Sequence, residues 1–165
     1  MAQQGTGSNP RSPASPASLA SPCAPDAGAV FTLADRLAAD TRPVGDLPLC
    51  RVLLMANAAF PWLILVPRRP GAVELHHLDP ADQQQVMGEM AAAASVLEQL
   101  TRPDKINLGA LGNLVPQLHI HVIARFRDDP AWPGPVWGSG RHQDYAPGAA
   151  ENFARRVAAA LGISG

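Results

Sequence analysis

Residues 117–123 read Gln-Leu-His-Ile-His-Val-Ile, an alternation of polar and large apolar side chains that limits what this segment can form. Successive side chains of a β-strand point to opposite faces of the sheet. We therefore predict a strand that carries Gln117, His119 and His121 on one face and packs its apolar residues against a core with the other. An imidazole, with a pKa of about 6.5, suits a nucleophile or proton carrier at neutral pH. The polar row therefore indicates a functional site.

Other segments predict the sheet to which this strand belongs. Short apolar runs at residues 50–56 and 62–66, with a turn between them, are typical of two paired strands. At residues 105–110, apolar residues alternate with Lys, Asn and Gly, which predicts a third strand that turns through Gly112 and Asn113 into the histidine strand. We therefore expect an antiparallel sheet.

Two helices complete the predicted fold. Asp79 suits the N-cap of a long helix and Pro80 its first position, while Pro103 bars extension much beyond Leu100. A last helix is predicted before the glycine at position 162, because three apolar residues share one of its faces: Phe153, Val157 and Leu161. The sequence thus predicts an α+β fold, an antiparallel sheet with one long helix packed on it and a C-terminal helix.

The chain divides into a tail and one domain. Residues 1–28 are rich in Ser, Pro, Ala and Gly and hold almost no large apolar side chain, so we predict a disordered tail. Residues 29–165 are predicted to form the domain. The tail lacks the continuous apolar stretch of a secretory signal, and no run of about 20 apolar residues predicts a membrane span.

Charge and cysteine content narrow the expected partners. Thirteen basic and fourteen acidic residues give a net charge of −1, which does not favour a nucleic-acid partner, so a small molecule is expected. The two cysteines lack the paired spacing of a zinc or redox motif. We therefore expect a reduced, cytoplasmic setting and no cofactor.

The histidine strand and its surroundings resemble the histidine triad (HIT) family. Its signature is His-φ-His-φ-His-φ-φ, where φ is apolar, after a segment that begins with Asn. Here Asn107 and the Gly-Asn-Leu-Val of residues 112–115 occupy that approach, and residues 117–123 occupy the triad with Gln in its first position. The resemblance extends over roughly residues 30–127, including the Leu-Val-Pro-Arg of residues 65–68. It implies that residues 29–165 form a HIT-like domain of bacterial type.

Family members are nucleotide hydrolases and transferases, so the resemblance implies a mechanism. His119, the middle position of the triad, would attack the α-phosphorus of a nucleotide-type substrate, and a nucleotidyl-histidine would then pass the group to water or another acceptor. His121 would bond the phosphate or the leaving group. Gly112 and Asn113, with nearby N–H groups, would hold non-bridging oxygens. The resemblance also implies a homodimer.

This chain departs from the family pattern at three positions. Gln117 replaces the first triad histidine and cannot titrate near pH 7, although it can still orient a neighbour. Trp62 stands where the family often has a histidine, and we expect it in the core or pocket wall. Leu114 stands where the family often has a phosphate-contacting Ser or Thr. Asn57 has two equal interpretations, a ribose contact or a simple turn residue.

Three functions therefore compete. The first is the hydrolase or transferase, with His119, His121 and Gln117 in the catalytic row and Asn57, Asn107, Gly112 and Asn113 binding substrate. The second is a nucleotide-binding module with weak or lost catalysis, favoured by the three departures. The third is a zinc site on the two histidines, which lacks a convincing third ligand. Two tryptophans could stack on a base or lie at a subunit contact: Trp132 and Trp137.

Overall fold

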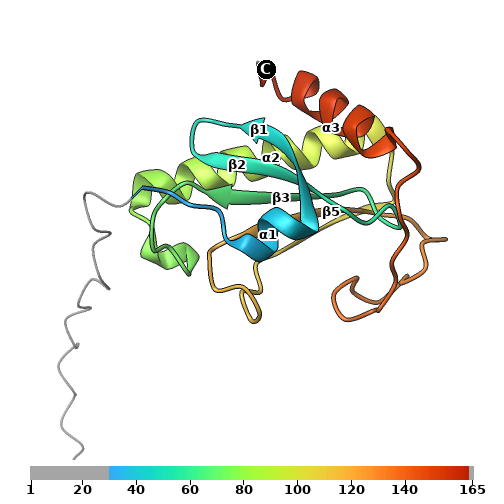
Figure 1. The fold of residues 1–165 in the computed structure, drawn as a ribbon, viewed down its shortest axis with the longest axis horizontal. Coiled ribbons are helices and arrows are strands. Elements are labelled where there is room, and N and C mark those ends of the chain that lie inside the picture. Colours follow the sequence, from blue (N-terminus) through green and yellow to red (C-terminus); the bar gives the residue numbers. More distant parts are fainter. Residues whose placement is uncertain (1–29, 164–165) are drawn as a thin grey trace, which may run out of the picture.

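The computed structural model describes residues 30–163, so the tail predicted at residues 1–28 lies outside the described residues. The predicted α+β class is confirmed, because the fold is one five-stranded sheet of order β1-β2-β3-β5-β4 with helices packed on it (Figure 1). Every pair of neighbouring strands is antiparallel. The strands are β1 Thr41–Asp46, β2 Cys50–Met55, β3 Trp62–Pro67, β4 Lys105–Gly109 and β5 Ile120–Arg125.

The long helix and the C-terminal helix are confirmed as α2 and α3. The Asp79 side chain accepts a hydrogen bond from the backbone N–H of Asp82 (2.8 Å), and α2 ends where Arg102 takes a left-handed conformation. No helix in the described part of the chain has the length and hydropathy needed to cross a membrane. The helices are α1 Asp35–Asp40, the 3-10 helix η1 Leu75–His77, α2 Pro80–Thr101 and α3 Ala149–Ala160.

The central strands of the sheet are buried on both faces. Helices α2 and α3 cover one face, and α1 lies on the other (Figure 1). Leu118, Ile120 and Val122 pack on the side of α2 and α3, as the alternation predicts. The opposite face is covered by residues 31–37 and by residues of the loop after β5. The polar row lies on this second face, between two irregular segments.

The structure differs from the sequence-based expectation in several places, among them the short helices α1 and η1, which were not expected. Strand β1 was not expected, because Pro43 and Gly45 interrupt its sequence; an edge strand tolerates both, and the register shifts between them. Gly45 has φ +148°, and a Cβ at this position would overlap the Ile163 side chain, which leaves no room for a larger residue. The histidine strand begins only at Ile120, so Gln117 lies in a loop rather than in the strand.

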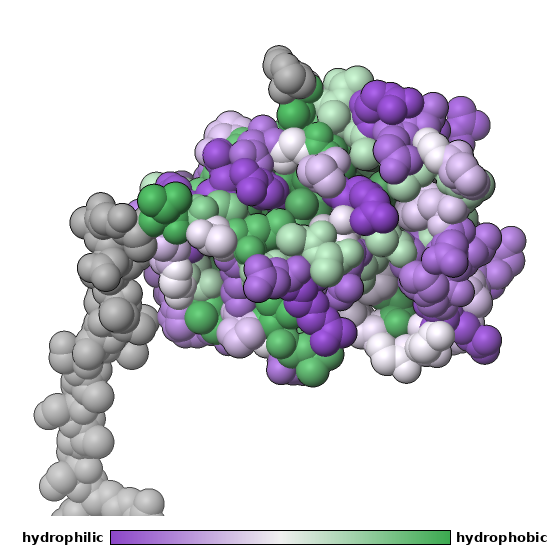
Figure 2. Space-filling view, in the orientation of Figure 1, coloured by the Kyte–Doolittle hydropathy of each residue, from purple (hydrophilic) through white to green (hydrophobic). Residues whose placement is uncertain are grey.

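Apolar side chains are exposed along the edge strand β4 and the loop that follows it. Leu108 is 48% exposed, Leu111 42% and Leu114 80%. Figure 2 shows apolar residues at the lower edge of the molecule, where Figure 1 places the loop between β4 and β5. This edge therefore combines unpaired backbone groups with apolar surface.

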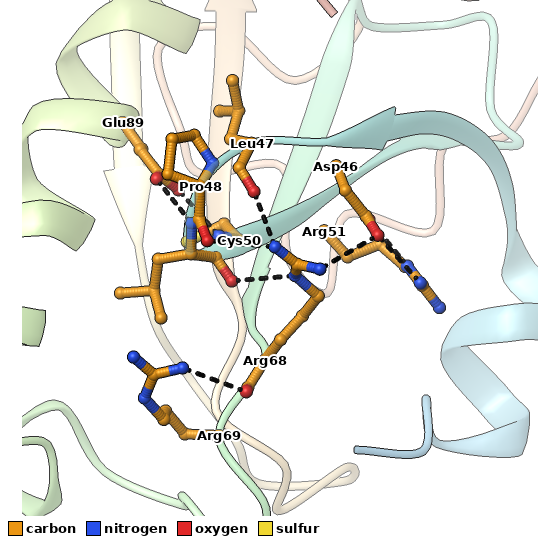
Figure 3. A network of polar contacts seen from close by, with 9 residues as sticks. Asp46, Leu47, Pro48, Cys50, Arg51, Arg68, Arg69 and Glu89 are labelled. Carbon is orange, nitrogen blue, oxygen red and sulfur yellow. Dashed lines mark hydrogen bonds and ion pairs between the residues drawn. The ribbon is translucent and has the colours of Figure 1, made fainter. Parts of the chain in front are cut away.

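The turn between β1 and β2 is held from two sides (Figure 3). Buried Glu89 of α2 accepts hydrogen bonds from the backbone N–H groups of Leu49 (2.8 Å) and Cys50 (2.7 Å). On the other side, the Arg68 guanidinium donates to the carbonyl oxygens of residues 47–49. The turn thus joins β2 to α2 through hydrogen bonds to a buried carboxylate.

Replacing Glu89 with glutamine should destabilise the protein by about 2 kcal/mol, because the new NH2 group would face a backbone N–H that then loses its acceptor. Chemical unfolding of the variant measures this loss. Glu98→Gln is the matched control: Glu98 is exposed on the same helix, so its replacement should change stability by less than about 0.5 kcal/mol. Equal losses in both variants would contradict a special role of Glu89.

Candidate functional site

Two buried histidines form the centre of the candidate site. His119 is 7% exposed and His121 is 6% exposed, and their ring centroids lie 4.9 Å apart. In the sheet, His121 lies between Ile64 of β3 and Gly109 of β4, which are its partners in the strand register. The predicted pairing of these histidines on one face is therefore seen in the structure.

The protonation of the His119 ring follows from its hydrogen bond. Its Nδ1 lies 2.7 Å from the carbonyl oxygen of Gln117. A carbonyl oxygen only accepts, so Nδ1 carries the hydrogen and the neutral ring has its lone pair on Nε2. The backbone of Gln117 thus sets the tautomer that a nucleophile needs.

The Gln117 side chain is bonded to the segment that precedes α1. Its Oε1 accepts from the backbone N–H of Ala34, and its Nε2 donates to the carbonyl oxygen of Thr32, both at 2.9 Å. Gln117, in the first triad position, therefore connects the loop between β4 and β5 to residues more than 80 positions earlier in the chain. Any orienting effect of Gln117 on His119 acts through its main-chain carbonyl.

His121 is surrounded by aromatic rings. The Trp62 indole N–H donates to Nδ1 of His121 at 3.0 Å, and the Trp137 ring lies edge-on with its centroid 5.6 Å from that of His121. Gly109 permits this arrangement, because a Cβ there would lie 2.8 Å from the Trp137 ring. Burial and the neighbouring His119 lower the pKa of His121 from 6.5 to about 4. His121 is therefore a neutral ring at physiological pH.

This lowered pKa predicts a pH-dependent stability. Between about pH 6.5 and 4 the unfolded chain takes up a proton at His121 that the folded protein does not, so the free energy of unfolding falls as the pH falls. The loss should approach at most about 3 kcal/mol. Urea unfolding at several pH values measures it. In His121→Gln, whose amide oxygen can still accept from Trp62, this part of the slope should vanish; an unchanged slope would contradict the assignment.

A buried ion pair organises the loop after β5, residues 126–137. Arg125 is 1% exposed and binds the Asp129 carboxylate through Nε (2.7 Å) and one terminal nitrogen (3.1 Å). Burial opposes ionisation of Asp129, but hydrogen bonds from Arg125 and from the backbone N–H groups of Ala131 and Phe126 lower its pKa overall. The same guanidinium donates to the carbonyl oxygen of Gly134 at 2.9 Å. Arg125 thus fixes the loop that carries Trp137.

The two asparagines predicted to bind substrate have their side-chain oxygens engaged elsewhere. Asn107 accepts from the Arg125 guanidinium at 2.7 Å. Asn57, 8% exposed, accepts from the backbone N–H groups of Ala59 and Gln143, and its Nδ2 donates to the carbonyl oxygen of Arg141. In the structure Asn57 therefore caps its own turn and binds residues 141–143.

Gly112 and Asn113 lie in the ten-residue loop that joins β4 to β5. Gly112 has φ +71°, a conformation that favours glycine, and Asn113 is exposed. The predicted β4–β5 hairpin is confirmed by its register, in which Gly109 pairs with His121. Leu114, one of the three departures named above, points an apolar side chain into solvent.

Sequence reasoning missed the residues that support the histidine pair. Trp62 was expected in the core or pocket wall, which its 6% exposure bears out, but its bond to His121 has no signature in the sequence. Arg125 and Asp129 had one available signal, an Arg at the end of an apolar strand with an Asp four residues later. Within residues 30–163, no group of three or more His, Cys, Asp and Glu side chains is placed to hold a metal ion.

Comparisons with known proteins agree on one family. The family model of the HIT domain matches residues 36–128. A solved histidine triad protein from Bradyrhizobium japonicum is 45% identical, with 81% of this chain and 99% of that chain covered and a TM-score of 0.78. One from Sinorhizobium meliloti is 47% identical (77% and 94% covered, TM-score 0.75), and one from Marinobacter aquaeolei is 42% identical (81% and 98%, TM-score 0.78). No curated protein matches the chain.

Proposed function

The chain belongs to the histidine triad family, and from this we propose that it is a nucleotide phosphoester or phosphoramidate hydrolase, or a nucleotidyl transferase, acting at the α-phosphate. The observation that carries the proposal is the hydrogen bond from His119 Nδ1 to the Gln117 carbonyl oxygen. This bond leaves the Nε2 lone pair free for attack, and it supports the positive charge that the ring gains once Nε2 is substituted.

The other site residues have supporting roles in this mechanism. His121 donates a hydrogen bond from Nε2 to the phosphoryl group. Gly112, Asn113 and nearby backbone N–H groups bind non-bridging oxygens, which N–H groups of an irregular loop suit. Asn57 and Asn107, predicted from the sequence to bind substrate, support the site through the groups to which they are bonded, residues 141–143 and Arg125. Gln117 orients His119 through its carbonyl oxygen and keeps residues 32–34 beside the site.

Trapping the covalent intermediate tests this function directly. The purified protein is mixed with diadenosine triphosphate and with adenosine 5′-phosphoramidate, quenched within milliseconds, digested and analysed by mass spectrometry. We expect an adenylyl group on the peptide that contains His119. Turnover of either substrate without an adduct on that peptide would contradict the mechanism, and absence of both turnover and adduct would contradict the enzyme itself.

One observation favours the second function, a nucleotide-binding module with weak or lost catalysis. The first triad position has no group that titrates near pH 7, and both ends of the Gln117 amide are bonded to backbone. Calorimetry separates the two functions: tight binding of adenosine monophosphate, with no adduct after millisecond quenching, would favour the module.

We also propose a cytoplasmic homodimer. The support for a dimer is the edge strand β4, whose unpaired backbone lies beside the exposed Leu108 and Leu111. Met87, 54% exposed on α2, adds apolar surface to a second element. Sedimentation at micromolar concentration measures the assembly, and a species with the 17.3 kDa mass of one chain would contradict the dimer.

A further inference from the structure

Trp62 makes a hydrogen bond to His121 that determines what this histidine can do. Trp62 is the first residue of β3 and 6% exposed, and its indole N–H lies 3.0 Å from Nδ1 of His121. An indole N–H only donates, so Nδ1 of His121 must present its lone pair. The neutral ring therefore carries its single hydrogen on Nε2.

The His121 ring has no favourable position for a second proton. It would have to enter at Nδ1, the position toward which the Trp62 hydrogen already points. Among residues 30–163, the contacts and strand partners of His121 supply no counter-charge: Trp62 and Ile64 come from β3, Trp137 from the loop after β5, and Gly109 from β4. The titratable neighbour among these contacts is His119, itself a base. Geometry and surroundings together keep His121 neutral.

The two histidines thus have opposite tautomers. His119 has its hydrogen on Nδ1, where it binds the Gln117 carbonyl oxygen, and its lone pair on Nε2. His121 has its lone pair on Nδ1 and its hydrogen on Nε2. A neutral imidazole donates a hydrogen bond from Nε2 but does not give up that proton near neutral pH. The pair therefore combines one nucleophile with one hydrogen-bond donor and contains no general acid.

We infer that Trp62 fixes His121 as a neutral hydrogen-bond donor, and that the site consequently prefers nucleotides whose leaving group departs as a stable anion, such as the phosphate oxygen of a polyphosphate, over those that release an amine. The inference rests on the proposed function, because it concerns the leaving group of the same reaction. Trp62 is a positioning residue in it, since its bond is to His121.

The chemical step explains the preference. Nε2 of His119 forms a bond to the α-phosphorus while the bond from phosphorus to the leaving oxygen breaks, and the electron pair departs with that oxygen. A polyphosphate oxygen carries this charge near pH 7 without a proton, and His121 Nε2–H can hydrogen-bond the phosphoryl group as charge develops. An amine departs only after its nitrogen has gained a proton. Water then attacks the phosphorus, the electron pair returns to Nε2, and a proton passes to solvent.

The first experiment compares two substrates that share adenosine and differ in leaving group. We expect kcat/KM for diadenosine triphosphate to exceed that for adenosine 5′-phosphoramidate by at least about a hundredfold, the usual contribution of a general acid. Equal values, or faster cleavage of the phosphoramidate, would overturn the inference while leaving the proposed function intact. If neither substrate is cleaved, both the proposed function and the leaving-group preference are wrong.

The second experiment measures the tautomer and the titration of His121 without any need for turnover. Nitrogen-15 NMR of the wild-type protein should show His121 with its hydrogen on Nε2 and no titration between pH 8 and about pH 5. Trp62→Phe removes the donor, so the ring should populate the other tautomer and titrate at higher pH. Trp137→Phe is the matched control: it alters a ring at similar distance whose indole nitrogen is not bonded to His121, and His121 should keep its tautomer.

One variant combines the substrate comparison with the NMR measurement. In Trp62→Phe, the preference for diadenosine triphosphate over the phosphoramidate should narrow by at least about tenfold, because His121 becomes free to take up a proton and act as an acid. A wild-type His121 that carries its hydrogen on Nδ1, or that titrates near pH 6.5, would overturn the inference even if Trp62→Phe fails to fold.

Discussion

Replacing His119 with alanine should lower kcat/KM for diadenosine triphosphate by at least about a thousandfold, because removal of a nucleophile deletes the covalent route and leaves only binding and charge stabilisation. Steady-state kinetics with purified variant and wild type measures the loss. Binding of adenosine monophosphate should change much less, since the remaining site groups are untouched. Calorimetry of the same samples separates lost chemistry from lost binding.

The control for this experiment is His76→Ala. His76 is exposed in η1, far from the site in sequence, and its removal should leave kcat/KM within about twofold of wild type. If His119→Ala retained wild-type turnover, the nucleotidyl-histidine mechanism would be wrong. If the wild type itself showed no turnover but bound the nucleotide tightly, the binding-module interpretation would replace it.

Replacing Arg125 with methionine should destabilise the protein by about 3 to 5 kcal/mol, the usual effect of removing one partner of a buried ion pair. The Asp129 side chain is 3% exposed and would be left as an unpaired buried carboxylate. The same change removes the hydrogen bonds to Asn107 and Gly134. Chemical unfolding measures the free energy, and the loop after β5 should become sensitive to proteolysis.

The chain offers a matched control two residues further on. Arg127 also pairs with an aspartate, Asp104, but its side chain is 80% exposed. Arg127→Met should therefore cost less than about 1 kcal/mol. The double variant Arg125→Met with Asp129→Leu should recover part of the stability, because it removes the stranded charge. A loss in Arg125→Met no greater than that in Arg127→Met would refute the structural role of the buried pair.

Much of the fold follows from patterns that are local in the sequence. Strands β2 and β3 are mostly apolar runs because they lie in the middle of the sheet, and α2 has a recognisable cap at Asp79. Strand β1 escaped prediction because Pro43 and Gly45 are tolerated only at a sheet edge, and a sequence does not state which strand forms the edge.

In the site, too, some residues were predictable from local patterns and others were not. His119 and His121 lie two positions apart in the sequence, so alternation alone places them on one face. Two distant contacts were less accessible: Trp62, which sets the tautomer of His121, lies 59 residues from it, and Ala34, which bonds the Gln117 side chain, lies 83 residues from Gln117. Such contacts depend on how strands are ordered and how segments return to the sheet. Local patterns therefore found the reacting groups and Gln117, and missed the distant residues that support them.

The attachment of Gln117 to Thr32 and Ala34 has a practical consequence for how this protein is cut into parts. The segment matched by the family model, residues 36–128, stops short of both supports of the histidine pair. A fragment with those boundaries would lack residues 32–34 on one side and Asp129 and Trp137 on the other. Truncations, fusions and purification tags should therefore leave at least residues 32–143 intact, because the described contacts of the site run from Thr32 to Gln143.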